Sequence, residues 1–204
     1  MTHSIADPES TANIGTGSDN GPAGLTSAAA PTRVGWSNAD LYRCGLPDAE
    51  RINDAIAASV NSLEEKDFDR RTHFVGGRFE NLYLERSRIP GIAAVLDQAL
   101  ACAGLILERP SKTLRCGFWL NLTGPGQSTS EHTHDESDEL LSAVYYVTVP
   151  PDSGDLILYD GPSTIRIEPR PGTFLFFPPT LPHAVEINRS TCRRLSIGIN
   201  IGPR

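Results

Sequence analysis

Hydrophobic residues in the first half of the chain recur at the spacing of a helix. The run LPDAERINDAIAASVNSLEEK begins with Pro47 after Leu46, and Asp48 follows where a helix would start. Its apolar side chains lie three or four positions apart, at Ile52, Ile56, Val60 and Leu63. Such spacing lines up one face of an α-helix.

A second helical pattern follows Pro90, a residue that suits the first turn of a helix. Its apolar face comprises Ile92, Val95, Leu96, Ala99 and Leu100. Gly104 is expected to end this helix. Two helices are therefore predicted within residues 47–104.

After Gly104 the helical period gives way to short runs rich in β-branched and aromatic residues. These runs are TLRCGFWLNLTG, LLSAVYYVTV, GDLILYDG, STIRIEP, GTFLFFP, HAVEIN and RRLSIGINI. Gly, Pro, Asp or Asn separates them at intervals typical of β-sandwiches and barrels. We therefore predict an α+β fold in which residues 112–202 form a jelly-roll, or double-stranded β-helix, with the helices packed outside.

Residues 1–33 have a different composition, rich in Ser, Thr, Gly, Ala, Pro, Asn and Asp, with almost nothing to bury. This composition predicts a disordered N-terminal tail. Residues 34–204 are long enough for one well-cored domain. A single domain preceded by a tail is the expected organisation.

Charge and composition narrow the classes of partner. The formal net charge is −7 and no basic run is present, so nucleic acid is not expected as the main partner. No apolar run approaches the roughly 18 residues that a membrane span needs. The N-terminus lacks the pattern of a signal peptide, and the four cysteines are scattered without a CxxC pair. These features favour a cytoplasmic protein with a small-molecule substrate, and they leave a homodimer open.

The segment EHTHDESDELL, residues 131–141, concentrates potential metal ligands in a chain with only five histidines. Residues two apart on an extended chain point the same way, so His132 and His134 can face one point, and so can His134 and Glu136. His183 follows about four predicted strands later, and a jelly-roll brings such distant strand ends together. Two imidazoles and a carboxylate with open positions form the ligand set of non-haem Fe(II) enzymes that activate O₂.

The spacing of these residues resembles the two cupin motifs in part. Gly126, His132, His134 and Glu139 follow the first motif, and Gly172, Pro178 and His183 follow the second. Tyr146 and Thr180, however, stand where cupins have turn glycines.

A longer resemblance, from about Phe74 to Ile201, is to the 2-oxoglutarate/Fe(II)-dependent oxygenases, in particular to small bacterial and phage members. The similar segments are HTHDESDELLSAVYYVTVPPDSGDLILYDG and PRPGTFLFFPPTLPHAVEINRSTCRRLSIGIN. In this family an Arg-x-Ser pair after the distal histidine holds the far carboxylate of 2-oxoglutarate, a role that the resemblance gives to Arg194 and Ser196. A guanidinium fork suits a carboxylate, and the hydroxyl adds a hydrogen bond.

The resemblance also implies that Tyr146 hydrogen-bonds the co-substrate, whereas Tyr145 points to the other face of the strand. Asn121 is a further candidate for the pocket. The usual ligands of the family are H-x-D or H-x-E with a distal His, which favours His134, Glu136 and His183. A three-histidine site, with His132 in place of Glu136, remains the alternative.

The resemblance thus implies an Fe(II)- and 2-oxoglutarate-dependent dioxygenase that uses O₂, and we expect it to hydroxylate a small molecule or an amino acid derivative. The alternatives are a cupin-type dioxygenase or isomerase that needs no 2-oxoglutarate, and a non-catalytic ligand-binding jelly-roll. No segment of the sequence identifies the substrate.

Overall fold

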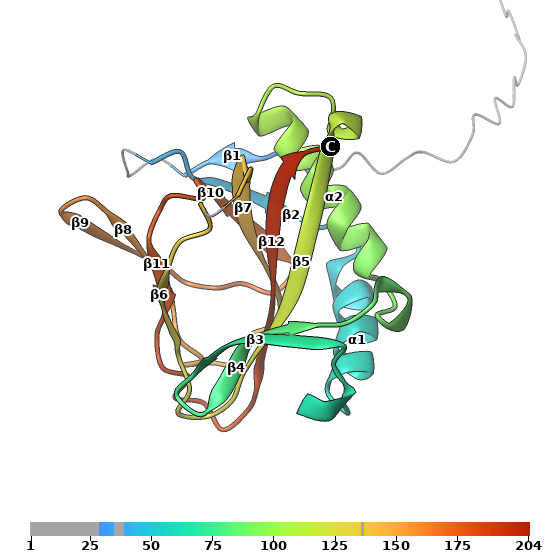
Figure 1. Ribbon diagram of the computed structural model, residues 1–204, viewed down its shortest axis with the longest axis vertical. Coiled ribbons are helices and arrows are strands. Elements are labelled where there is room, and N and C mark those ends of the chain that lie inside the picture. The colour runs from blue at the N-terminus through green and yellow to red at the C-terminus, as the bar shows by residue number, and fades with distance from the viewer. Residues whose placement is uncertain (1–28, 35–38, 136) are drawn as a thin grey trace, which may run out of the picture.

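The protein folds into two antiparallel β-sheets with two α-helices packed against one of them (Figure 1). The computed structural model describes residues 29–34, 39–135 and 137–204. The helices are α1 (Ala49–Val60) and α2 (Ile92–Ile106), with 3-10 turns at Glu65–Asp67, Arg86–Arg88 and Ser111–Thr113. The first six strands are β1 (Thr32–Arg33), β2 (Tyr42–Gly45), β3 (Arg70–Val75), β4 (Arg78–Tyr83), β5 (Leu114–Thr123) and β6 (Thr129–His132). The other six are β7 (Leu141–Thr148), β8 (Leu156–Asp160), β9 (Ser163–Ile167), β10 (Thr173–Phe177), β11 (His183–Val185) and β12 (Arg194–Pro203).

The large sheet has the order β1-β2-β10-β7-β12-β5-β4-β3, and the small sheet has the order β6-β11-β8-β9. β12 lies near the middle of the large sheet and pairs along its whole length with β5, from Arg194 opposite Thr123 to Pro203 opposite Leu114. On its other side it pairs with β7. These central strands fix the positions of the side chains that face the small sheet.

Two hydrophobic clusters hold the layers together. In the larger one, α1 and α2 pack on the outer face of the large sheet, where Leu195, Ile197 and Ile199 alternate along β12. The smaller cluster lies between the sheets and includes Leu158 of β8 and Phe177 of β10. Each fully buried aliphatic or aromatic side chain contributes roughly 1.5–3 kcal/mol. The two faces of β12 therefore differ: its apolar residues pack against the helices, and its polar residues face the barrel interior.

The predicted fold class is confirmed, and each of the seven predicted β-runs forms a strand. Five further short strands, β1, β2, β3, β4 and β6, were not predicted, because their residues are largely polar or half exposed and lack a clear apolar run. Gly104 does not end the second helix, which continues to Ile106. A Cβ at Gly104 would lie 2.9 Å from the backbone oxygen of Arg109, so glycine is needed there for the following loop to pack closely.

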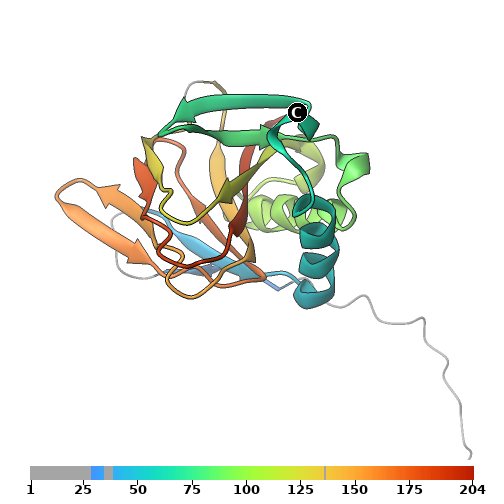
Figure 2. The same ribbon diagram turned by 90° about the horizontal axis from the view of Figure 1, so that it is seen from below.

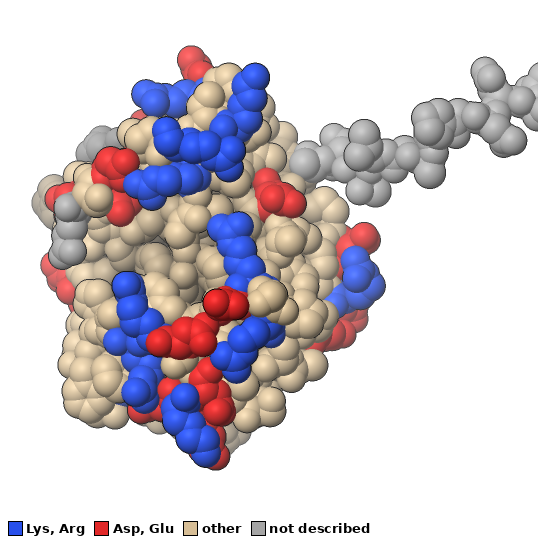
Figure 3. Space-filling view, turned by 45° about the vertical axis from the view of Figure 1, so that its right-hand side comes forward, with Lys and Arg blue, Asp and Glu red and all other residues tan. Residues whose placement is uncertain are grey.

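Most of the predicted tail, residues 1–28, lies outside the described residues, whereas Thr32–Arg33 forms β1 and pairs with β2. Among the residues that the structure describes, no helix has the length and apolar character needed to cross a membrane. On the face shown in Figure 3, acidic and basic side chains form small interspersed groups without a large basic area.

The hairpin of β3 and β4 extends the large sheet beyond β5 and reaches toward β6. Figure 2 shows this hairpin in green, running from the helical side of the molecule to the edge of the small sheet. The buried Arg78 of β4 donates to the carbonyl of Ser128 at 2.7 Å and to Thr129 Oγ1 at 3.1 Å. The hairpin thus links the two sheets next to the end of β6.

Candidate active site

Three histidines converge at one end of the small sheet. His132 ends β6, His134 follows two residues later, and His183 begins β11, opposite His132 in the strand pairing. Their potential ligand atoms all lie within 4.8 Å of one another. A single metal ion placed between the rings could therefore contact all three side chains.

Backbone carbonyls orient two of these rings. His132 Nδ1 lies 2.8 Å from the carbonyl oxygen of Ser130, and His183 Nδ1 lies 2.9 Å from that of Leu181. Because a carbonyl oxygen only accepts, each Nδ1 carries the proton and each Nε2 keeps a free lone pair for a metal. In metal sites, the ring nitrogen that does not bind the metal commonly donates such a hydrogen bond and so fixes the orientation of the histidine.

The surroundings also keep two of the imidazoles, those of His134 and His183, neutral. Burial lowers the pKa of His134 to about 3, and the neighbouring His183, His132 and His73 add to this effect. Burial also lowers the pKa of His183 to about 4, with His132 as the second cause. Both rings are therefore uncharged at pH 7, which is the form that binds metal ions.

The indole of Trp119 forms a wall of the site, a role that sequence reasoning missed. Its ring centroid lies 5.2 Å from that of His134. Trp119 on β5 is opposite Gly198 on β12, and a Cβ at position 198 would collide with the indole ring. The glycine therefore makes room for the tryptophan. The available signal was the two-residue spacing of Trp119 and Asn121, which puts both on one face of β5.

Glu136, the carboxylate favoured as the third ligand, lies outside the described residues. The three-histidine cluster includes His132, the alternative ligand, together with His134 and His183. Glu139, which occupies the ligand position of the cupin motif, is not part of this cluster. The geometry therefore gives no support to the cupin ligand set.

The residues expected to hold 2-oxoglutarate lie on the large sheet, facing the histidines. Asn121 on β5 and Tyr146 on β7 are both direct strand partners of Ser196 on β12, so the three side chains share one row and one face. Asn121 and Ser196 line a small cavity together with the three histidines. Tyr145 lies on the opposite face, where its hydroxyl donates to Asn53 of α1 at 2.7 Å.

Arg194 is almost completely buried, with 1% of its surface exposed, and yet it has no carboxylate partner among the described residues. One guanidinium nitrogen donates to the carbonyl of Gly154 at 2.6 Å, and the group lies 5.3 Å from the ring centre of Tyr146. Three buried side-chain polar atoms in the described part of the chain lack a hydrogen-bond partner: Tyr146 OH, Ser153 Oγ and Arg194 Nε. All three belong to this neighbourhood.

A buried guanidinium without a counter-charge is costly unless a ligand supplies one. The unused donors around Arg194 match a carboxylate, which accepts two bonds from a guanidinium and further bonds from hydroxyl groups. The residues present therefore fit the far end of 2-oxoglutarate. In the same way, the free Nε2 atoms of the histidines fit a divalent metal ion.

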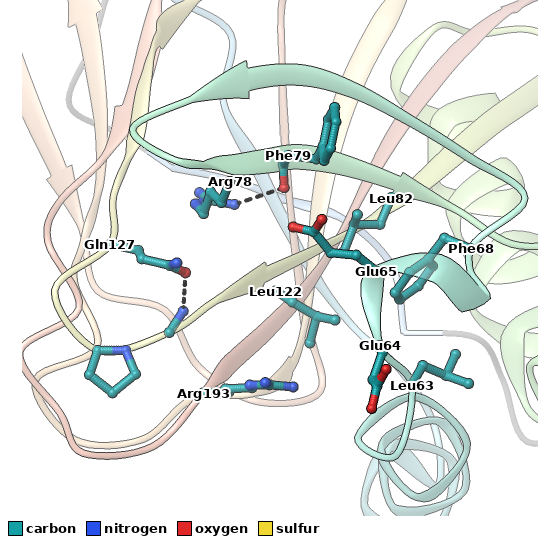
Figure 4. A pocket seen from close by; sticks show the side chains of 12 residues that line it. Leu63, Glu64, Glu65, Phe68, Arg78, Phe79, Leu82, Leu122, Gln127 and Arg193 are labelled. Carbon is teal, nitrogen blue, oxygen red and sulfur yellow. Dashed lines mark hydrogen bonds between the residues drawn. The ribbon is translucent and has the colours of Figure 1, made fainter.

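Two larger cavities flank the hairpin. One, of about 350 Å³, is lined by residues of β3 and β4 and by His132 and His134. The other, of about 450 Å³, is lined by residues such as Phe68, Arg78 and Leu122 and contains none of the three histidines (Figure 4). The smaller cavity is thus the one that gives access to the cluster.

Comparison with known proteins agrees with this site. The sequence model of the 2OG-Fe(II) oxygenase superfamily matches residues 118–202, which include all three histidines and Arg194. No curated protein matches the chain significantly.

Solved structures share the fold at low sequence identity. A Pseudomonas putida prolyl-4-hydroxylase is 18% identical with a TM-score of 0.63, covering 80% of this chain and 92% of that one. A Trichoplax adhaerens prolyl hydroxylase in complex with a hypoxia inducible factor peptide is 13% identical with a TM-score of 0.61, covering 80% and 83%. The epimerase SnoN from nogalamycin biosynthesis, in complex with Fe³⁺, alpha ketoglutarate and nogalamycin RO, is 15% identical with a TM-score of 0.63, covering 80% and 78%.

The matched region holds the histidine cluster, the row of polar residues on the large sheet and the buried arginine. Together with the double-stranded β-helix, this match favours an oxygenase over both the cupin and the non-catalytic jelly-roll. Residues 118–202, which carry the histidine cluster and Arg194, are thus similar to the 2OG-Fe(II) oxygenase superfamily, and the fold of the chain is shared with solved 2-oxoglutarate-dependent oxygenases.

Proposed function

We propose that this protein is an Fe(II)- and 2-oxoglutarate-dependent oxygenase that hydroxylates a small molecule or an amino acid derivative, with His132, His134 and His183 holding the iron. The observation that carries this proposal is the convergence of three imidazoles opposite a strand that carries a buried arginine without an ion-pair partner among the described residues. The cavity over the histidines has a volume of about 350 Å³, within the range for a small ligand.

When bound, Fe(II) and 2-oxoglutarate supply the oxidising chemistry: O₂, 2-oxoglutarate and a substrate C–H group yield succinate, CO₂ and a hydroxylated product. The protein contributes the fixed positions and a site shielded from water. The carbonyls of Ser130 and Leu181 hold the rings of His132 and His183 in place. Arg194 and Ser196, with Tyr146 and Asn121 in the adjacent row, bind and orient the co-substrate.

The small and large sheets divide this work between them. The proposed iron ligands lie on or next to β6 and β11, whereas the proposed co-substrate residues lie on β5, β7 and β12. The two sets face each other across the barrel interior. 2-Oxoglutarate would be held at its metal-binding end by one sheet and at its far carboxylate by the other.

Succinate formation from 2-oxoglutarate tests the activity directly. The purified protein with Fe(II), ascorbate and O₂ is expected to produce succinate even without a substrate, through slow uncoupled turnover. Omission of Fe(II) is the control. A protein that binds iron and 2-oxoglutarate but releases no succinate, with or without a panel of small-molecule substrates, would contradict the proposal.

Metal content measured in single variants tests the ligand set. His132→Ala, His134→Ala and His183→Ala are each expected to abolish stoichiometric Fe(II) binding, because each removes one of three donors. Glu136→Ala is the matched comparison and should keep the metal, with at most the 10- to 100-fold loss typical of a residue that only supports a ligand. The reverse result, with Glu136 indispensable and His132 tolerant, would establish two histidines and a carboxylate.

A further inference from the structure

The cavity that leads to the histidine cluster has the β3–β4 hairpin as one of its walls. Arg70, Thr72 and His73 of β3 and Glu80, Asn81 and Tyr83 of β4 line it, together with His132 and His134. A molecule bound in this cavity would touch the hairpin and the metal cluster at the same time. The chemistry of the hairpin therefore bears on what the enzyme oxidises.

His73 adopts a backbone conformation that is unusual for its position in a strand. Its φ is 57°, in the left-handed region, although it is neither glycine nor part of the Gly76–Gly77 turn. Side chains occupy this region at an energetic cost, and such outliers cluster at binding and catalytic sites. The conformation of His73 is thus a reason to look for a function of its ring.

Hydrogen bonds fix the orientation of that ring. The amide nitrogen of Asn81 donates to His73 Nδ1 at 3.0 Å, and the hydroxyl of Thr72 lies 3.0 Å from the same atom. Since Nδ1 accepts, the proton of the neutral ring lies on Nε2. His73 therefore offers one N–H group that no described residue accepts.

Arg70 is the second unused donor of the hairpin. Its guanidinium stacks on the ring of Tyr83, 4.1 Å from the ring centre, and forms no ion pair with any described carboxylate. The next residue, Arg71, points to other partners, since it lies over the ring of Phe79 and 3.7 Å from Glu65. Stacking on Tyr83 holds the Arg70 fork in one plane without using its N–H groups.

The acidic side chains of the same cavity already accept hydrogen bonds from the protein. Glu80 accepts from the backbone N–H of Ser130 at 3.0 Å and lies 3.9 Å from Arg78. Glu139 accepts from the backbone N–H of Ser137 at 3.1 Å. These bonds hold both carboxylates against the protein, whereas Arg70 and His73 keep N–H groups without a described acceptor, and an anionic ligand group would complement those two donors.

Building on the proposed hydroxylase function, we propose that the substrate is a small organic acid whose carboxylate is bound by Arg70 and His73. A planar guanidinium pairs with a carboxylate through two parallel bonds, and His73 Nε2–H adds a third. This site is distinct from that of 2-oxoglutarate, because Arg194 is buried on β12 and does not line this cavity. The carboxylate would fix the substrate at the hairpin and leave its carbon chain directed at the metal cluster.

Calorimetric titration of the Fe(II)- and 2-oxoglutarate-loaded protein without O₂ tests this proposal. The probes are hexanoate, benzoate, N-acetyl-L-leucine and N-acetyl-L-phenylalanine, each compared with its primary amide. At least one acid is expected to bind about tenfold or more tightly than its amide. Arg70→Gln and His73→Gly should each remove this preference, while Arg71→Gln is the matched control and should retain it.

Two further measurements separate a binding role from a structural one. His73→Gly should keep or raise the melting temperature, because glycine adopts a positive φ without strain. Both hairpin variants should still bind 2-oxoglutarate within about twofold of the wild type. If no acid binds better than its amide, or if Arg71→Gln loses the preference as Arg70→Gln does, the assignment of the carboxylate site is wrong. Failure of the wild type to bind 2-oxoglutarate would instead refute the proposed function.

Discussion

Two buried arginines of the large sheet, on strands separated by β5, differ in how their charge is satisfied. Arg78, 5% exposed on β4, donates to the Ser128 carbonyl and to Thr129 Oγ1 and lies 3.9 Å from the carboxylate of Glu80. Arg194, 1% exposed on β12, has one carbonyl partner and an Nε without any. Burial lowers the pKa of both guanidinium groups; Glu80 opposes this at Arg78, and Tyr146 and Asp155 oppose it at Arg194.

The difference separates a structural charge from a ligand-binding one. Removing a charge from water costs several kcal/mol, which a partner must offset. The partners of Arg78 belong to the protein, so the cost of burying its charge is offset without any ligand. Arg194 forms no ion pair with any described carboxylate, and Asp155 acts on it only from beyond ion-pair distance, so its charge is fully compensated only when an anion binds. If cavity volume were the criterion, Arg78 would be taken for the ligand-binding arginine, because it lines the larger of the two cavities, of about 450 Å³ (Figure 4).

The largest expected effect is on the stability of the Arg78 site. Arg78→Met leaves the buried carboxylate of Glu80 without its counter-charge and should lower the free energy of unfolding by about 3–5 kcal/mol. Chemical denaturation measures this loss. The double variant Arg78→Met/Glu80→Gln should recover part of it, and no recovery would show that packing rather than charge is responsible.

Arg194→Met should have the opposite profile. It removes a buried charge that the described protein groups hardly compensate, so the unfolding free energy without ligand should stay the same or rise. Binding of 2-oxoglutarate, measured by calorimetry, should weaken by about 2–5 kcal/mol, while Fe(II) content is retained. Arg193→Met is the control. A loss of stability equal to that of Arg78→Met would mean that Arg194 is structural.

Addition of 2-oxoglutarate should stabilise the wild-type protein but not the Arg194→Met variant. At one hundred times the dissociation constant, a ligand that binds only the folded state adds about 2.7 kcal/mol. Thermal unfolding of the iron-loaded protein with and without 2-oxoglutarate measures this. Equal stabilisation of both proteins would show that the far carboxylate is bound elsewhere.

The smallest expected effect concerns Tyr146, whose buried hydroxyl has no partner in the protein. Tyr146→Phe removes a polar atom that gains nothing in the ligand-free fold, so stability should be unchanged or slightly higher. Binding of 2-oxoglutarate should lose about 0.5–1.5 kcal/mol, the net contribution of one hydrogen bond. Tyr145→Phe is the contrasting variant, because its hydroxyl donates to Asn53 and should matter for folding only.

Periodicity in the sequence predicted the parts of the fold with a strong apolar pattern. The alternation of Arg194, Leu195, Ser196 and Ile197 assigned both faces of β12, since one face packs on helices and the other on polar groups. The short strand β6 was missed because TSEH has no apolar repeat, and with it the pairing that sets His132 opposite His183. Spacing alone could not show this pairing, because it depends on contacts between residues about fifty positions apart.

Other features of the site had no recognisable signal in one sequence. The left-handed conformation of His73 cannot be inferred, since histidine rarely requires it. The place of Trp119 depends on the absence of a side chain at Gly198 on a strand about eighty residues later. Such pairs become visible only when the register of the sheet is known.

The division of the site between two sheets has a dynamic consequence. With the proposed iron ligands on the small sheet and the proposed co-substrate residues on the large one, bound 2-oxoglutarate acts as a cross-link between the layers. Relative motion of the sheets, which the interior cluster around Leu158 and Phe177 and the hydrogen bonds of Arg78 restrain when the site is empty, should then be damped further. This coupling predicts slower amide hydrogen exchange in β6 and β11 when 2-oxoglutarate is bound. The co-substrate would then stabilise the arrangement of the two sheets for as long as it stays bound.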